Sequence, residues 1–63
     1  MREYRWFFQN GAAELIAADR GRFLTPDDAM AWAGALLSKH TTAVAVEVWD
    51  GAHMVGRRDR AGT

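Results

Sequence analysis

Hydrophobic residues recur at every second position in two stretches of this chain, Arg2 to Gln9 and Ala43 to Trp49. Alternation of this kind is typical of a strand with one buried face. We therefore predict a strand in each stretch, with one apolar side facing the core. The apolar residues on these sides are Tyr4, Trp6 and Phe8 in the first strand and Val44, Val46 and Val48 in the second.

Between the two strands, residues 24–40 carry the period of an α-helix. Thr25 is a favourable N-cap, a proline follows at the first helical position, and Asp28 suits a variant of the capping box. At about 100° per residue, one side of the helix is apolar and is expected to pack on a sheet, with Trp32 and Leu36 in the core. The full set on this side is Ala29, Trp32, Ala33, Leu36, Leu37 and His40, with Met30 at its margin.

Residues that favour turns separate these elements. Asn10-Gly11 predicts a two-residue type I′ turn with a return strand from Ala13 to Ala18. Asp19 to Arg22 predicts a turn before the helix, where Leu24 would act as the hydrophobic staple. Asp50-Gly51 predicts a second hairpin. Its loop is either a two-residue type I′ turn or a three-residue loop in which Gly51 makes a bulge, and the choice shifts the register of His53 to Arg58 by one.

The order strand, strand, helix, strand, strand predicts an α+β fold of two layers, with one helix packed on an antiparallel four-stranded sheet. The central pair of this ββαββ sheet is expected to join residues 2–9 to residues 43–49. We expect a single small domain over residues 1–63. Within it, residues 58–63 lose the apolar alternation and predict a frayed basic tail.

The composition indicates that the small core has no covalent support, since the 63 residues include no cysteine. Below roughly 70–80 residues, a single core seldom supplies more than about 3–5 kcal/mol, and natural proteins of this size often gain stability by oligomerisation. We therefore expect a homo-oligomer, with a dimer as the simplest form.

The charges balance, with eight basic and eight acidic residues. This balance removes the broad positive field on which non-specific binding to nucleic acids or anionic membranes relies. The chain also lacks the roughly 18 consecutive apolar residues of a membrane span and the apolar run of a signal peptide. We expect a soluble, cytoplasmic protein that does not bind membranes.

No combination of residues predicts catalysis or a bound cofactor. His40 and His53 lack the short spacing of metal ligands, and helix capping already explains Asp27 and Asp28. The glycines fit turns and do not form a phosphate-binding loop. The sequence therefore predicts a protein that is not an enzyme, with no catalytic residues, no metal and no cofactor.

Two surfaces are candidate interfaces. One is the back of the helix, where small residues would allow a second helix to approach closely, unless they are only alanine-rich surface. The other is the sheet face away from the helix, where two aromatic residues would be exposed in a monomer. The candidate interface residues are Ala31, Gly34, Ala35 and Ser38 on the helix and Arg5, Phe7 and Trp49 on the sheet.

Three segments resemble parts of small bacterial ββαββ domains of unknown function. They are Tyr4–Phe8 before Asn10-Gly11, Thr25–Ala29, and Val46–Gly51. This resemblance implies the ββαββ fold and transfers no catalytic residue. The segment TPDDAMAWAGALL also resembles the helix of HicB-type antitoxins, although the glycine-rich strands of that family are absent upstream.

These patterns favour a non-enzymatic interaction module that self-associates or binds another protein. The alternative is a single-stranded nucleic-acid-binding domain that stacks bases on Phe7 and Trp49. That alternative assigns the nucleic-acid backbone to arginines at both ends of the chain, which are Arg2, Arg5, Arg57, Arg58 and Arg60. A third possibility is a small antitoxin-like or phage-borne regulator of a larger partner.

Overall fold

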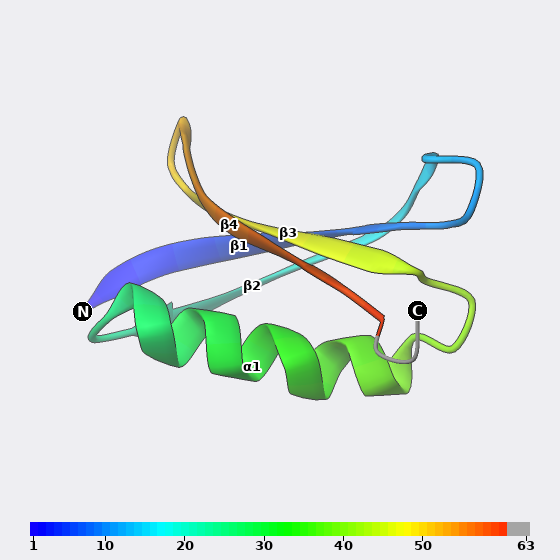
Figure 1. The fold of residues 1–63 in the computed structure, drawn as a ribbon. Helices are drawn as coiled ribbons and strands as arrows, with labels where there is room; N and C mark the ends of the chain where they lie inside the picture. The colour runs from blue at the N-terminus through cyan, green and yellow to red at the C-terminus, as the bar shows by residue number, and fades with distance from the viewer. Residues whose placement is uncertain (61–63) are drawn as a thin grey trace.

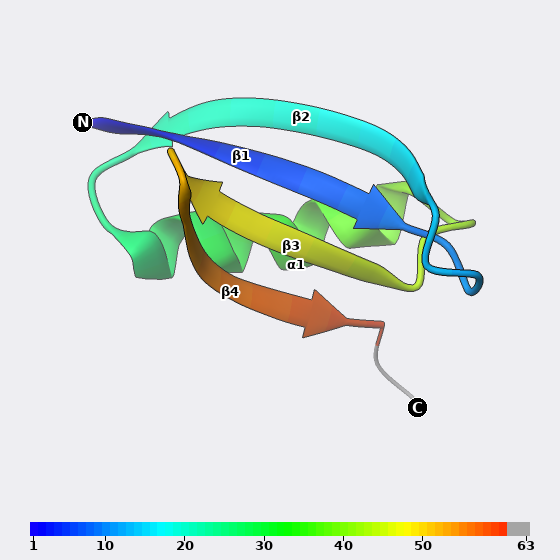
Figure 2. The ribbon, with the colours of Figure 1, turned by 90° about the horizontal axis from the view of Figure 1, so that it is seen from above.

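The computed structural model describes residues 1–60. Its elements in chain order are β1 (Arg2–Gln9), β2 (Leu15–Phe23), α1 (Pro26–Lys39), β3 (Ala45–Asp50) and β4 (His53–Asp59). The strands form one antiparallel sheet in the order β2-β1-β3-β4, and α1 lies across one face of it (Figures 1 and 2). The structure confirms the predicted α+β ββαββ fold, including the central pairing of β1 with β3.

The core lies between α1 and the helix-facing side of the two central strands. Trp6 is fully buried there, and its indole N–H donates a hydrogen bond to the carbonyl of Ala29 at 3.1 Å. Gly21 in β2 gives this indole room, because a Cβ built at Gly21 would lie only 3.1 Å from Trp6 ring atoms. The residues of this core are Tyr4, Trp6, Phe8, Ala43, Val46 and Val48 from the sheet side, and Ala29, Ala33, Leu36 and Leu37 from α1. Ala45 is also buried but does not belong to this cluster.

Both ends of α1 are capped. The side-chain oxygen of Thr25 accepts a hydrogen bond from the backbone N–H of Asp28, as the sequence predicted. At the other end, the guanidinium of Arg60 donates to the carbonyls of Ala43, Leu37 and His40 at 2.6–2.8 Å. This contact places a positive charge at the negative end of the helix dipole and satisfies terminal carbonyls.

The predicted frayed tail is wrong for residues 58–60. Arg58 and Asp59 belong to β4, which pairs with β3, and Arg60 caps the helix. Main-chain pairing with β3 holds this segment even though its side chains no longer alternate in hydrophobicity. The rest of the predicted tail, residues 61–63, lies outside the described residues.

The first hairpin differs from the prediction. Asn10 does not occupy a left-handed turn position; its side-chain oxygen accepts hydrogen bonds from the backbone N–H groups of Ala12 and Glu14 at 3.0 Å. The loop therefore has three residues between Asn10 and Glu14, and Ala13 takes the left-handed conformation with φ 63°. The predicted turn at residues 19–22 is also wrong, because these residues continue β2 in register with β1.

The structure decides between the two loop lengths that the sequence left open for the second hairpin, and so fixes the register of β4 against β3. Asp50 pairs with His53, so the loop consists of Gly51, with φ +62°, and Ala52. A positive φ at the first loop residue alone is the pattern of a type II′ turn, so the loop has two residues but is not the type I′ turn that the sequence predicted for that length. An irregularity lies further along, where Val48 pairs with Gly56 but Trp49 pairs with Met54, and it leaves Val55 as an extra residue.

Two helix-side predictions are wrong. Trp32 is 46% exposed and does not belong to the core, and the expected staple residue Leu24 is 70% exposed. Trp6 already fills the core beneath Ala29, and Trp32 lies on the flank of α1 beside Phe23, with ring centroids 6.3 Å apart. Because β2 is the edge strand on that side of the sheet, no further strand of residues 1–60 covers the outer part of the indole.

Candidate functional site

The predicted interface residues fall on opposite sides of the molecule. Arg5, Phe7 and Trp49 lie on the open face of the sheet, which we define as the face away from α1. The other four, Ala31, Gly34, Ala35 and Ser38, belong to α1. They therefore do not form one site, and each surface has to be considered separately.

On the open face, a polar network is centred on Glu47, which lies directly opposite Phe7 and bonds to Trp49. The indole N–H of Trp49 donates to one carboxylate oxygen of Glu47 at 3.1 Å, and the side-chain amide of Gln9 donates to the other at 3.1 Å. Arg57 lies 3.8 Å from the same carboxylate. Phe7 and Trp49 are half-buried, so the expectation that a monomer would expose both aromatic residues is wrong.

Arginines of the open face concentrate on β1 and β2. Arg5 lies directly opposite Arg20 on one side and Trp49 on the other, while Arg22 lies opposite Glu3. Sequence reasoning missed Arg20 and Arg22 because it placed them in a turn. Directly opposed like charges destabilise a sheet, and the only carboxylate paired with Arg20 within the described residues is Glu3, at 3.9 Å.

Four of the five arginines assigned to a nucleic-acid backbone are engaged elsewhere. Arg2 pairs with Asp50, and Arg57 pairs with Glu47 and Asp59. Arg58 covers Gly34 of α1, and Arg60 caps the helix. Of these five, only Arg5 lies on the open face without an ion pair among residues 1–60.

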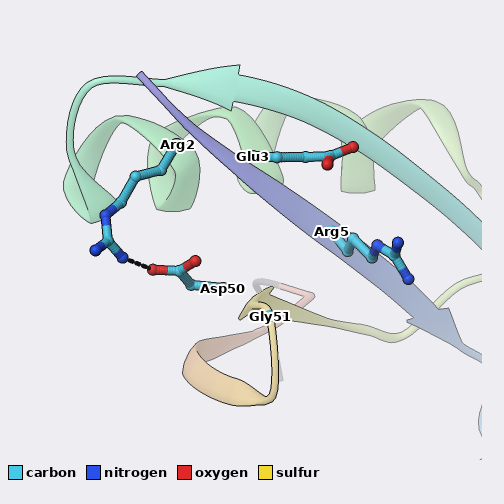
Figure 3. A pocket seen from close by; sticks show the side chains of 5 residues that line it. All are labelled: Arg2, Glu3, Arg5, Asp50 and Gly51. Atoms are coloured by element: carbon cyan, nitrogen blue, oxygen red, sulfur yellow. Dashed lines mark hydrogen bonds and ion pairs between the residues drawn. The ribbon is translucent and has the colours of Figure 1, made fainter.

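A shallow depression at one end of the sheet is lined by Arg2, Glu3, Arg5, Asp50 and Gly51. Figure 3 shows Arg2 turned towards Asp50, whereas Arg5 extends away from that pair. The charged groups therefore do not converge on one point. This arrangement does not form a site for a small anion.

The back of α1 is less open than the sequence suggested. A Cβ built at Gly34 would lie 3.4 Å from the guanidinium carbon of Arg58, so β4 already covers this side of the helix. The hydroxyl of Ser38 donates to the carbonyl of Gly34 at 3.3 Å. Ala31 and Ala35 remain exposed.

The other flank of α1, towards β2, carries the most prominent exposed aromatic residue. We define the Trp32 face as the exposed stripe formed by Asp28, Ala31, Trp32, Ala35 and Lys39. Neither Asp28 nor Lys39 forms a salt bridge within the part of the chain that the structure describes. Sequence reasoning named Ala31 and Ala35 as interface residues but missed Trp32, because helical periodicity alone assigned Trp32 to the core.

The two histidines lie in different surroundings. His40 packs on Phe8, with ring centroids 4.2 Å apart, and His53 is exposed at the start of β4. Among residues 1–60, no group of three or more potential metal ligands is present. The one helix in this range is also too short and too polar to cross a membrane.

Comparisons with known proteins do not assign this chain to a family. No protein-family model, no curated protein and no solved structure matches it. The resemblance to bacterial ββαββ domains therefore stays a prediction, and a functional hypothesis has to start from the surfaces described above.

Proposed function

We propose that this protein is a non-enzymatic, cytoplasmic interaction module that self-associates through the Trp32 face. The observation that supports the proposal most strongly is the 46% exposure of Trp32, beside the exposed Ala31 and Ala35. Removing apolar surface from water contributes about 25 cal/mol per Å². A partner that covers the indole therefore gains free energy without any rearrangement of the core.

The edges of the sheet are less suited to self-association. Asp19 lies opposite Trp6 in β2, so its carboxylate is on the helix side of an edge strand, and the other edge carries Arg57, Arg58 and Asp59. Charged residues on edge strands, especially those pointing inwards, oppose pairing with another sheet. The open face is also less suited, because Phe7 and Trp49 are already half-buried there.

Sedimentation equilibrium over a range of protein concentrations tests this proposal. We expect the average mass of the wild type to rise from the 7.0 kDa of one chain towards twice that value. Trp32→Ala should keep the mass near that of one chain. Met54→Ala is a matched control, because Met54 is 43% exposed but lies in β4 opposite Trp49 on the open face. A wild type that stays at 7.0 kDa at every concentration would refute self-association.

The second candidate function is binding of single-stranded nucleic acid on the open face. The observation in its favour is the direct opposition of Arg5 and Arg20, with Trp49 opposite Arg5 and Phe7 two residues further along β1. A phosphate between the two guanidinium groups would relieve their repulsion, while a base stacks on an aromatic ring. The carboxylates of Glu3 and Glu47 oppose this function.

Fluorescence anisotropy of a labelled oligothymidine tests the second candidate. Binding should weaken with added salt, and Arg5→Gln should weaken it further. Arg58→Gln removes the same charge from the helix side of the sheet and should leave binding unchanged. The absence of binding at low salt, or equal losses in the two variants, would exclude the open face as a nucleic-acid site.

A further inference from the structure

The Trp32 face carries opposite charges at its two ends, Asp28 and Lys39. Building on the proposed function, we infer that two α1 helices pack antiparallel, so that Asp28 of each copy faces Lys39 of the other. Trp32 of each copy then packs on Ala35 of the other.

The spacing of the residues on the Trp32 face places them in one row. Asp28, Trp32, Ala35 and Lys39 are separated by four, three and four positions, the spacing of neighbours along one side of a helix. At about 100° per residue, the last three lie within roughly 40° of Asp28 around the helix axis. All are exposed, so a second helix can lie along the whole row.

The row is complementary to itself only when the second helix is reversed. The midpoint of the row along the helix lies between positions 33 and 34. A two-fold axis at this level places Asp28 of one copy beside Lys39 of the other, and Trp32 of one copy beside Ala35 of the other. A large indole then meets a methyl group, and opposite charges meet at both ends. A parallel arrangement would instead bring together two aspartates, two indoles and two lysines.

Two further observations favour the reversed arrangement. The carboxylate of Asp28 and the ammonium of Lys39 have no ion-pair partner within residues 1–60, so both charges are available to a second copy. Antiparallel helices also bring the positive end of each helix dipole near the negative end of the other. The orientation therefore rests on charge and size together, and not on the small residues alone.

The expected contact is modest in size. A helix of 14 residues is about 21 Å long at 1.5 Å per residue. One helix pair of that length buries less surface than the roughly 1,200–2,000 Å² of a standard stable interface. We therefore expect a reversible dimer whose population depends on protein concentration.

A charge-reversal cycle measured by sedimentation equilibrium tests the orientation. Asp28→Lys should weaken the dimer about tenfold, because the two-fold axis turns two weak attractive pairs into two repulsive ones. Lys39→Asp should have an effect of similar size. The double variant Asp28→Lys/Lys39→Asp should return the dissociation constant to within about threefold of the wild type, because both attractive pairs are restored.

The charge-reversal cycle distinguishes the loss of a contact between the two copies from the loss of helix stability within one copy. Each reversal places the wrong charge at a helix end, so the double variant should be the least stable fold in thermal unfolding and yet recover the dimer. Asp27→Lys is the matched control, since it changes the same helix end but lies about 100° away from Asp28. It should leave the dissociation constant within about threefold of the wild type on the same basis.

The possible failures are distinguishable. If the wild type forms a dimer that Trp32→Ala abolishes, but the double reversal shows no recovery, the antiparallel orientation is wrong and the proposed function stands. If Asp27→Lys weakens the dimer as much as Asp28→Lys, the orientation is also wrong. If the wild type is a monomer at every concentration, both the orientation and the self-associating function fail.

Discussion

The two faces of the sheet are built from alternating residues of the same strands, yet they differ in how their aromatic side chains are held. On the face covered by α1, Trp6 and Phe8 are fully buried. On the open face, which also carries Gln9, Glu47 and Arg57, Phe7 and Trp49 are half-buried.

This difference shows what the single helix contributes. It converts one face into a dry core, whereas the other face depends on hydrogen bonds and ion pairs that remain partly in water. Such exposed pairs each contribute little. The helix also has a flank of its own beyond the sheet, and there Trp32 stays 46% exposed beside Phe23.

The largest expected effect comes from truncating neighbouring phenylalanines on the two faces. Phe8→Ala should lower the free energy of unfolding by about 3–5 kcal/mol, as expected for a fully buried phenylalanine. Phe7→Ala, one residue away on the open face, should cost about 1 kcal/mol because its ring is only half-buried. Urea unfolding measures both. If Phe8→Ala does not fold, Phe8→Leu and Phe7→Leu provide a milder comparison, and equal losses would refute the contrast between the faces.

A smaller effect is expected when two arginines near the end of β4 are compared. Arg60→Gln removes charge-assisted hydrogen bonds to carbonyls at the end of α1 and should cost about 2 kcal/mol. Arg57→Gln removes ion pairs on the open face and should cost less than about 1 kcal/mol. Thermal unfolding monitored by circular dichroism gives the comparison. The helix-capping role of Arg60 is wrong if both variants lose the same small amount.

The covered face contains a buried polar group without a hydrogen bond, and a substitution that removes this group should stabilise the protein. The hydroxyl of Tyr4 is buried and has no hydrogen-bond partner among residues 1–60. Tyr4→Phe removes this unmatched polar group and should raise the free energy of unfolding by about 1 kcal/mol. Trp6→Phe, which removes a polar group that is bonded to Ala29, should instead destabilise the fold. A destabilised Tyr4→Phe protein would show that this hydroxyl is satisfied in solution.

The smallest effect is expected outside both faces, in the first hairpin loop. Ala13 has φ 63°, a conformation that costs a residue with a Cβ about 1–2 kcal/mol. Ala13→Gly should therefore stabilise the protein by about 0.5 kcal/mol after the greater chain entropy of glycine is subtracted. Ala12→Gly lacks this benefit because Ala12 does not have a positive φ, and it should be neutral or destabilising. Denaturant midpoints compare the two variants.

Patterns among neighbouring residues in the sequence were enough to predict α1, β1 and most of β3. The N-cap at Thr25 and the proline that follows it define the start of α1, and alternation defines β1 and most of β3. The pairing of β1 with β3 was also predictable, because these strands carry the most regular buried faces.

The features that sequence reasoning missed depend on distant residues. β2 contains Asp19 and Gly21, which favour turns, but pairing with β1 keeps them in a strand. Arg60 acts through carbonyls about twenty positions away in the chain. The exposure of Trp32 could not be read from helical periodicity, because it depends on Trp6 filling the core and on β2 being the edge strand.

Mixed-copy paramagnetic relaxation tests most directly whether a second copy covers the Trp32 face. The chain has no cysteine, so Ser38→Cys allows one spin label, beside Lys39, on an unlabelled copy mixed with a ¹⁵N-labelled wild-type copy. The antiparallel dimer predicts the strongest signal broadening at the amides around Asp28 of the ¹⁵N-labelled copy. Broadening around Lys39 of that copy, broadening on the open face, or no broadening at concentrations where mass measurements show a dimer would contradict the account.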